Sequence, residues 1–134
     1  MTAAPALDTI TVLTTDNHQI KIRLAEIDAP ELSQPYGKKA KQRLSLMVFG
    51  KDVSITPMTI DQYRRTVARV YQGTTDINLA MVQTGAAWAY RKYLTDTAFL
   101  KAEAEARKAR TGLWALQPDQ ITPPWDWRHA RTAR

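Results

Sequence analysis

The central segment of this sequence is Arg23-Leu24-Ala25-Glu26-Ile27-Asp28-Ala29-Pro30-Glu31, which begins as a strand and ends as an acidic turn. Apolar and charged side chains alternate over residues 19–27, as they do in a strand with one buried face. Pro30 then stops the strand and biases the residue before it toward an extended conformation. Arg23 therefore sits on a rigid strand beside two carboxylates, Asp28 and Glu31. A fixed cation beside acids that could hold a hard metal ion suits a phosphate ester as substrate.

The composition indicates one globular domain with a basic excess. The chain has 134 residues, of which 44% are hydrophobic and 24% charged, and it is long enough to bury a core. Its formal net charge of +6 favours a polyanionic partner, either nucleic acid or an anionic surface, although such an excess can also serve solubility alone. The absence of cysteine excludes disulfides and thiolate metal sites. No apolar run approaches the roughly 18 residues that cross a bilayer, and residues 1–7 lack the features of a signal peptide, so we expect no membrane segment.

Periodicity and turn signals predict an α+β domain built from short elements. The predicted strands share alternation or flanking turn residues, and they span residues 10–13, 19–27, 53–58, 66–71 and 86–91. The predicted helices share helical spacing of apolar residues, and they span residues 38–49, 77–84 and 97–110. Glu103 and Glu105 on the last helix are interpreted as solvated charges. Short strands with an intervening helix favour a small barrel, although periodicity alone indicates only α+β.

The C-terminal segment contains Pro123-Pro124-Trp125-Asp126-Trp127-Arg128. Two tryptophans beside arginines could stack on nucleic-acid bases, but covering part of the core is the preferred interpretation. Residues 129–134 are polar and basic, so we expect them to be disordered. No pair of histidines has the spacing of metal ligands, which argues against a zinc site.

Four motifs together resemble the staphylococcal nuclease-like (thermonuclease) family. They read Ile22-Arg23-Leu24-Ala25-Glu26-Ile27-Asp28-Ala29-Pro30-Glu31, Tyr36-Gly37-Lys38-Lys39-Ala40, Asp61-Gln62-Tyr63-Arg64-Arg65-Thr66-Val67-Ala68-Arg69-Val70-Tyr71 and Gly112-Leu113-Trp114. They fall in the family's order with family-like spacing. The resemblance covers residues 8–128 and implies one OB-fold domain over that range, a five-stranded β-barrel with three helices. Residues 1–7 are then an N-terminal remnant, which we expect to be flexible.

The resemblance also implies an activity: calcium-dependent endonucleolytic hydrolysis of DNA and RNA, with little sequence specificity and 3′-phosphate ends. Matched by position, it implies a general base at Glu31, phosphate-binding arginines at Arg23 and Arg65, and calcium ligands at Asp8 and Asp28. These residue types suit the reaction, because arginine stays charged and grips two oxygens, a carboxylate can activate water, and calcium takes oxygen ligands. Further candidate substrate contacts are Arg64, Tyr63 and Tyr93.

Two features depart from the family pattern. The first barrel strand is missing or shortened, because only residues 1–7 precede Asp8. A lost strand exposes a sheet edge. The barrel is then either completed by a partner chain, as a strand-completed dimer, or left partly open with a poorer metal site. The second departure is Arg64, which stands where the family usually has glycine, so a positive φ there would strain the backbone.

Alternative interpretations remain for one arginine and for the whole chain. Arg65 could form a surface salt bridge with Asp61 instead of binding phosphate. The chain could be a catalytically weak or inactive nucleic-acid-binding OB-fold module, or a protein-interaction barrel. The joint presence of Arg23, Glu31 and Arg65 favours the enzyme. No obligate protein partner is evident from the sequence, and the resemblance implies a secreted or periplasmic location.

Overall fold

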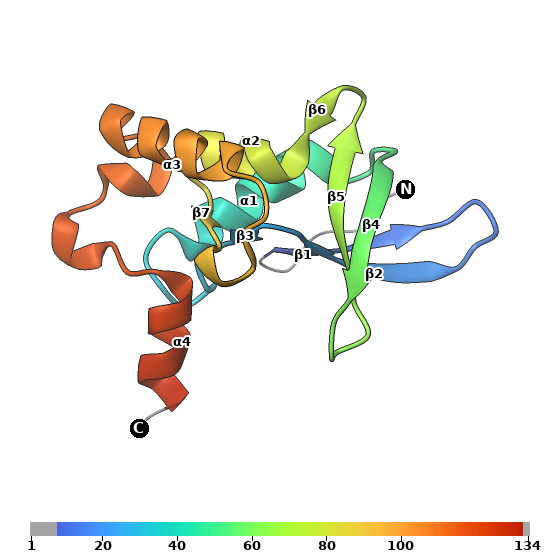
Figure 1. Cartoon of the computed structure of the whole chain (residues 1–134), viewed down its shortest axis with the longest axis horizontal. Helices are drawn as coiled ribbons and strands as arrows, with labels where there is room; N and C mark the ends of the chain where they lie inside the picture. The colour runs from blue at the N-terminus through green and yellow to red at the C-terminus, as the bar shows by residue number, and fades with distance from the viewer. Residues whose placement is uncertain (1–7, 133–134) are drawn as a thin grey trace.

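The computed structural model describes residues 8–132, and its main feature is a β-sheet flanked by helices (Figure 1). The sheet has five strands. Four of them follow the order β1 (Thr9–Leu13), β2 (Gln19–Leu24), β5 (Thr66–Gln72) and β4 (Ser54–Ile60), and β6 (Thr75–Asp76) pairs with β5. The predicted α+β class is therefore confirmed, and the predicted strands 10–13, 53–58 and 66–71 correspond to β1, β4 and β5.

The parallel pairing of β2 with β5 determines where the two candidate arginines lie. Arg23 in β2 is opposite Val67 in β5. Arg65, which immediately precedes β5, therefore approaches the segment of β2 that carries Arg23. On the other side of β2, antiparallel β1 places Thr9 opposite Arg23. The chain around residues 8, 23 and 65 thus meets at one end of the sheet.

The sheet does not close into a barrel within residues 8–132. The terminal strands β1 and β4 do not pair with each other; their main-sheet neighbours are β2 and β5. The barrel closure that the family resemblance implies is therefore absent from the described part of the chain. The expected flexibility of residues 1–7 concerns a segment outside that part.

The strand predicted over residues 19–27 ends early, because the chain turns at Glu26. Glu26 has a φ of 73°, and its buried carboxylate accepts hydrogen bonds from the backbone N–H groups of Thr95 and Asp96 at 2.9 Å each. Beyond this turn, β3 (Ile27–Asp28) pairs with β7 (Trp88–Ala89) in a separate two-stranded sheet. The segment predicted as extended at residues 86–91 therefore contributes to this small sheet and not to the main one.

Four α-helices lie within residues 8–132, where the sequence predicts three. Helices α1 (Gly37–Val48), α2 (Ile77–Gln83) and α3 (Ala98–Ala109) correspond to the predicted ones, and Figure 1 shows them grouped beside the sheet. The fourth is α4 (Pro124–Thr132). Short 3₁₀ turns occupy Arg91–Tyr93 (η1), Gly112–Ala115 (η2) and Pro118–Gln120 (η3). None of the helices in this described part is long and apolar enough to span a membrane.

Helix α4 corrects the prediction of a disordered tail at residues 129–134. Pro124 begins the helix, a position where its missing N–H would have no helical partner. The carbonyl of Pro123 accepts hydrogen bonds from the N–H groups of Asp126 and Trp127 at 3.0 Å each. Residues 129–132 continue this helix, whose first turns are anchored by side-chain contacts described below. Residues 133 and 134 lie outside the described part.

The main apolar core lies between the sheet and helices α1–α3. Its largest fully buried apolar side chains include Phe99, Ile10, Ile22, Leu24, Ile27, Leu44, Ile77 and Met81. A buried amide, Asn78, crosses this core: it accepts a hydrogen bond from the N–H of Val70 at 3.0 Å and donates to the carbonyls of Ala25 and Ala68 at 2.9 and 3.0 Å. Asn78 therefore joins α2 to β5 and to the end of β2.

Glu103 on α3 is only 2% exposed, so its interpretation as a solvated charge is wrong. Its carboxylate accepts hydrogen bonds from the N–H of Ala89 at 2.9 Å and from the guanidinium groups of Arg91 and Arg107 at 2.7 and 3.2 Å. Burial of the charge is tolerated because it is paired and hydrogen-bonded. Glu105, on the outer face of the same helix, is exposed as predicted.

Candidate functional site

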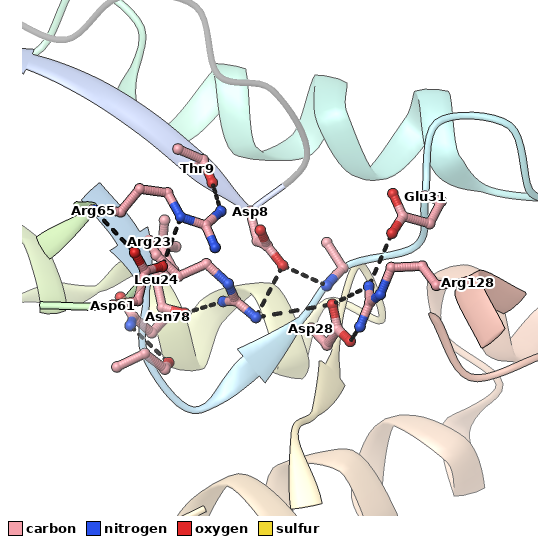
Figure 2. Close-up of polar contacts among 12 residues, drawn as sticks. Asp8, Thr9, Arg23, Leu24, Asp28, Glu31, Asp61, Arg65, Asn78 and Arg128 are labelled. Carbon is pink, nitrogen blue, oxygen red and sulfur yellow. Dashed lines mark hydrogen bonds and ion pairs between the residues drawn. The ribbon is translucent and has the colours of Figure 1, made fainter. Parts of the chain in front are cut away.

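Arg23 lies at the centre of a cluster of charged side chains at the end of β2 (Figure 2). Its Nη2 is 3.3 Å from Oδ2 of Asp8 and 3.9 Å from Oδ1 of Asp28. Its Nη1 donates to the carbonyl of Leu24. The guanidinium carbon lies 5.7 Å from the ring centroid of Tyr90, within the range of a cation–π contact. One arginine therefore joins two of the predicted metal ligands.

Asp8 immediately precedes β1 and is held by a backbone hydrogen bond to the end of β2. Its carbonyl accepts a hydrogen bond from the N–H of Leu24 at 3.0 Å, which extends the β1–β2 ladder by one position. Its side-chain Oδ2 accepts from the N–H of Ala29 at 3.3 Å. Asp8 is buried, and through these two bonds it ties the start of β1 to the turn that carries the other acids.

Asp28 ends the short strand β3, where it is opposite Trp88 of β7. Its side chain is only 1% exposed. Burial raises the pKa of Asp28 to about 6; hydrogen bonding to Arg128 opposes the rise, the charge of Asp8 adds to it, and the charge of Arg23 opposes it. The other acids and cations of the cluster therefore act directly on the protonation of this group.

Glu31 and Asp28 are bridged by Arg128 of α4, a residue that the sequence pattern does not mark as part of the site. Nη1 of Arg128 is 2.9 Å from Oε1 of Glu31 and 3.1 Å from Oδ1 of Asp28, and Nη2 is 2.6 Å from Oδ2 of Asp28. Hydrogen bonding to Asp28 raises the pKa of Arg128 further above its ordinary value. The only sequence signal for this contact is a Pro-Pro helix start ahead of Arg128, which does not indicate the acids that it faces.

Arg65 adjoins the cluster from the start of β5. Its Nε is 2.8 Å from Oδ2 of Asp61, so the predicted alternative of a salt bridge is present. Its Nη1 donates at 3.1 Å to the hydroxyl of Thr9, the neighbour of Asp8. Burial is the largest single influence on Asp61 and acts to raise its pKa, but hydrogen bonds from the N–H and side chain of Arg65 and from the N–H of Tyr63, with the charge of Arg65, together hold the pKa below the usual value. The Asp61 contact therefore orients a guanidinium that also reaches β1.

The three candidate substrate contacts lie around the cluster and not inside it. Tyr63 and Arg64 are exposed in the β4–β5 turn, and Tyr63 lies with its ring centroid 5.4 Å from the guanidinium carbon of Arg65. Arg64 has a φ of 62°, the positive φ that would strain a non-glycine residue there. Tyr93 is exposed in η1, and its ring centroid is 5.4 Å from that of Tyr90, the residue under Arg23. Tyr90 is a second neighbour of the site that the sequence pattern does not indicate.

No group of three or more histidine, cysteine, aspartate or glutamate side chains is arranged as a metal site in residues 8–132. The acids of the cluster do provide the hard oxygen donors that calcium prefers. In this arrangement, however, arginine nitrogens and a backbone N–H approach the oxygens of Asp8 and Asp28. The donor chemistry fits a hard cation, whereas the geometry shown is that of a cluster neutralised by its own arginines.

Taken together, the structure brings Asp8, Arg23, Asp28 and Glu31 into one network of ion pairs, with Arg128 as an additional member (Figure 2). Within the described part of the chain, Arg65 has no ion pair with these residues and approaches them through its hydrogen bond to Thr9, the sequence neighbour of Asp8. Arginines in such a cluster can position a phosphate and neutralise developing negative charge. A neighbouring carboxylate can activate a water molecule.

Several known proteins are similar in sequence to this chain over most of its length. A family model described as Staphylococcal nuclease homologue matches residues 21–116, a range that contains Arg23, Asp28, Glu31 and Arg65 but not Asp8 or Arg128. An uncharacterized endonuclease of Haemophilus influenzae is 46% identical over 121 residues, covering 90% of this chain and 67% of that protein. A micrococcal nuclease of Shigella flexneri is 43% identical over 134 residues, covering 92% of this chain and 75% of that protein. A probable staphylococcal-like nuclease of Oryza sativa subsp. japonica is 40% identical over 116 residues, covering 85% of this chain and 31% of that protein.

Proposed function

Because this chain belongs to the staphylococcal nuclease homologue family, we propose that it is a calcium-dependent endonuclease that hydrolyses DNA and RNA with little sequence specificity and leaves 3′-phosphate ends. The observation that carries this proposal is the convergence of Asp8, Arg23, Asp28 and Glu31 into one ion-pair network, in which Arg128 links Glu31 to Asp28.

Arg23 and Arg65 bind the scissile phosphate and stabilise the transition state. The planar guanidinium group of arginine can donate two parallel hydrogen bonds to phosphate oxygens. The extra negative charge that develops on these oxygens during attack is stabilised most effectively by donors that are already in place. Asp8 and the Tyr90 ring preorient Arg23, and Asp61 preorients Arg65.

Glu31 acts as the general base that takes a proton from the attacking water. Its side chain is 19% exposed, so water can reach it, whereas Asp28 at 1% is sealed from solvent. Its backbone N–H donates to Oε1 of Gln34 at 2.7 Å, which holds the turn that presents the carboxylate. A carboxylate in reach of the nucleophilic water typically contributes about 10²–10⁴-fold to the rate.

Asp8 and Asp28 are the residues that would hold calcium. A bound calcium ion supplies positive charge against the phosphoryl oxygens and tolerates an irregular set of oxygen ligands. The contribution of this chain is to fix the two carboxylates, through the Ala29 N–H bond of Asp8 and through the strand pairing of Asp28 with Trp88.

Low sequence specificity follows from the kind of contact that the site can make. Arginines and a metal ion read phosphates, which are the same in every sequence, and phosphate contacts position a nucleic acid without distinguishing its bases. The net charge of +6 adds a long-range attraction that is also independent of sequence. DNA and RNA are therefore both substrates.

Plasmid digestion tests the proposal. We expect nicking with added calcium, none with a chelator, and a loss of about 10²-fold or more in Glu31→Gln. Glu105→Gln, which removes an exposed carboxylate from α3, is the matched control and should cleave at the wild-type rate. Cleavage products should resist extension by a polymerase until a phosphatase removes the 3′-phosphate. Equal cleavage by Glu31→Gln and wild type would refute the role of Glu31.

A catalytically weak or inactive nucleic-acid-binding module is the second candidate. It is favoured by one observation, the occupation of the Asp28 and Glu31 oxygens by Arg128. A gel-shift assay beside the digestion separates the two candidates, because the module binds DNA without cleaving it at any calcium concentration.

A further inference from the structure

We propose that the guanidinium of Arg128, which pairs with Asp28 and Glu31, and a divalent cation compete for the carboxylate of Asp28, so that Arg128 sets the cation affinity of the site. This inference rests on the proposed function, since it concerns the acids assigned there to the metal and to the general base. It resolves the disagreement between a donor set suited to calcium and a geometry in which arginines hold the donors.

The contacts of Arg128 show that it stands in a cation's position. Its two terminal nitrogens reach both oxygens of Asp28 and one oxygen of Glu31, at distances between 2.6 and 3.1 Å. The oxygen lone pairs of Asp28 are among those that a cation held by Asp8 and Asp28 would need. Guanidinium and metal therefore cannot both hold them in this arrangement.

The difference in burial indicates which partner moves. Asp28 is 1% exposed and is fixed by strand pairing with Trp88, and Nη2 of Arg23 lies 3.9 Å from its Oδ1. No open side of Asp28 is left for an added ion. The Arg128 side chain is 40% exposed, and an arginine side chain has several rotatable bonds that allow it to adopt other rotamers. An ion reaches Asp28 when Arg128 swings into solvent.

The charge of the cluster favours exchange over addition. Three carboxylates, Asp8, Asp28 and Glu31, face two guanidiniums, Arg23 and Arg128. A divalent cation added with both arginines in place would leave excess positive charge in a partly buried site, which is unfavourable. The same cation with Arg128 withdrawn leaves the cluster neutral.

Helix α4 is held by contacts that do not involve Arg128. The Trp125 ring stacks on Tyr90, with centroids 5.6 Å apart and an interplanar angle of 18°, and meets Trp88 edge-on at 5.6 Å. The indole N–H of Trp127 donates to the hydroxyl of Ser33 at 3.2 Å. The side chain of Arg128 can therefore leave the acids while the helix stays docked.

Calorimetric titration with calcium chloride tests the competition in the full chain. Arg128→Gln removes the competing cation, so it should bind calcium about tenfold more tightly than wild type. Arg128→Lys keeps the charge but loses the planar fork, so its affinity should lie between the two. Arg43→Gln removes an equal charge from the exposed face of α1 and should bind like wild type. Circular dichroism and tryptophan emission should be unchanged in all variants.

The calcium affinities of the variants distinguish competition by Arg128 from the alternatives. Calcium affinity in Arg128→Gln equal to that of wild type would overturn the competition. Weaker binding would overturn it too, and would show that Arg128 instead holds the two acids in place. Absence of calcium binding in every variant would remove the ion for which Arg128 is said to compete. Tighter binding in Arg128→Gln without DNA cleavage by any variant would support the competition and contradict the proposed nuclease.

Discussion

Asp28 is the acid of the candidate site with the least exposure, and its position shows what burial does to a titrating group. Two arginines approach its oxygens, yet desolvation raises the pKa of Asp28 to about 6, because the loss of water costs more than the pairing returns. The Asp28 carboxylate is therefore always in contact with other charged groups in the folded protein. Because its pKa differs between the folded and unfolded chain, its protonation affects stability.

Replacing Asp28 by asparagine should change how stability depends on pH. The folded protein keeps the Asp28 proton up to about pH 6, whereas the unfolded chain releases it near the ordinary pKa of 3.8. Between these values the folded state binds more protons, so raising the pH lowers the stability of the wild type through this group. Through this group the free energy of unfolding of the wild type should fall by about 2 kcal/mol between about pH 4 and pH 7. Asp28→Asn should not show this fall when unfolded in urea at the two pH values.

The control for this measurement is Asp119→Asn, which removes an exposed carboxylate from η3. Its pH dependence should match that of the wild type. A pH dependence of Asp28→Asn that also matches the wild type would show that Asp28 titrates alike in the folded and unfolded chains.

At the scale of single residues, the sequence predicts contacts between residues that are close along the chain. Arg23, Asp28 and Glu31 are close in the chain, and the strand-to-turn pattern is enough to place them together. The Arg65–Asp61 pair is also a short-range contact. Arg128 meets Asp28 across 100 positions of sequence, and no local pattern distinguishes it from the other arginines of a basic tail.

Among the elements, the β4–β5 turn carries Arg65 and has a strained backbone. Oδ1 of Asp61 accepts hydrogen bonds from the N–H groups of Tyr63 and Arg65 at 2.9 Å each, which folds the turn tightly. Arg64 between them has a φ of 62°. A side chain at such a φ is disfavoured, because its Cβ crowds the backbone.

Replacing Arg64 by glycine should stabilise the protein by about 0.5–1 kcal/mol, because glycine adopts a positive φ without strain. Chemical denaturation measures the change. Arg64→Ala is the matched variant, since it removes the same charge and leaves the strain, and it should be no more stable than the wild type. Equal stability of the glycine and alanine variants would mean that the turn relaxes freely around Arg64.

The elements that the sequence does not predict are those decided by distant contacts. The break after β2 depends on the carboxylate of Glu26, which binds the N–H groups of residues 95 and 96. Helix α4 depends on Trp125 packing against Tyr90 and Trp88. Alternation and helical spacing, which are local, correctly predict β1, β5 and helices α1–α3.

For the whole molecule, the basic excess should make nucleic-acid binding strongly salt-dependent. Each phosphate contact releases a condensed counterion, so the affinity falls as the salt concentration rises. With about three contacts, made by Arg23, Arg65 and a neighbouring cation, raising the salt concentration from about 50 to 200 mM should weaken binding roughly 50-fold. Fluorescence anisotropy with Glu31→Gln and duplexes of unrelated sequence measures this without cleavage. The salt dependence should be the same for each duplex; a strong preference for one sequence would argue against a phosphate-reading site.

The parallel pairing of β2 with β5 has a consequence for changes in chain length. No turn connects these two strands, so their alignment depends on the lengths of the segments that lead into them and on the contacts of Asn78 with both. A one-residue deletion between Asp61 and Arg65 would either disrupt the turn that orients Arg65 or shift the register of β5 by one residue, which turns its side chains to the opposite face. An insertion at residues 15–18, in the exposed tip of the β1–β2 hairpin, would leave both arginines where they are. We therefore expect natural length variation to accumulate at the hairpin tip and to be absent ahead of β5.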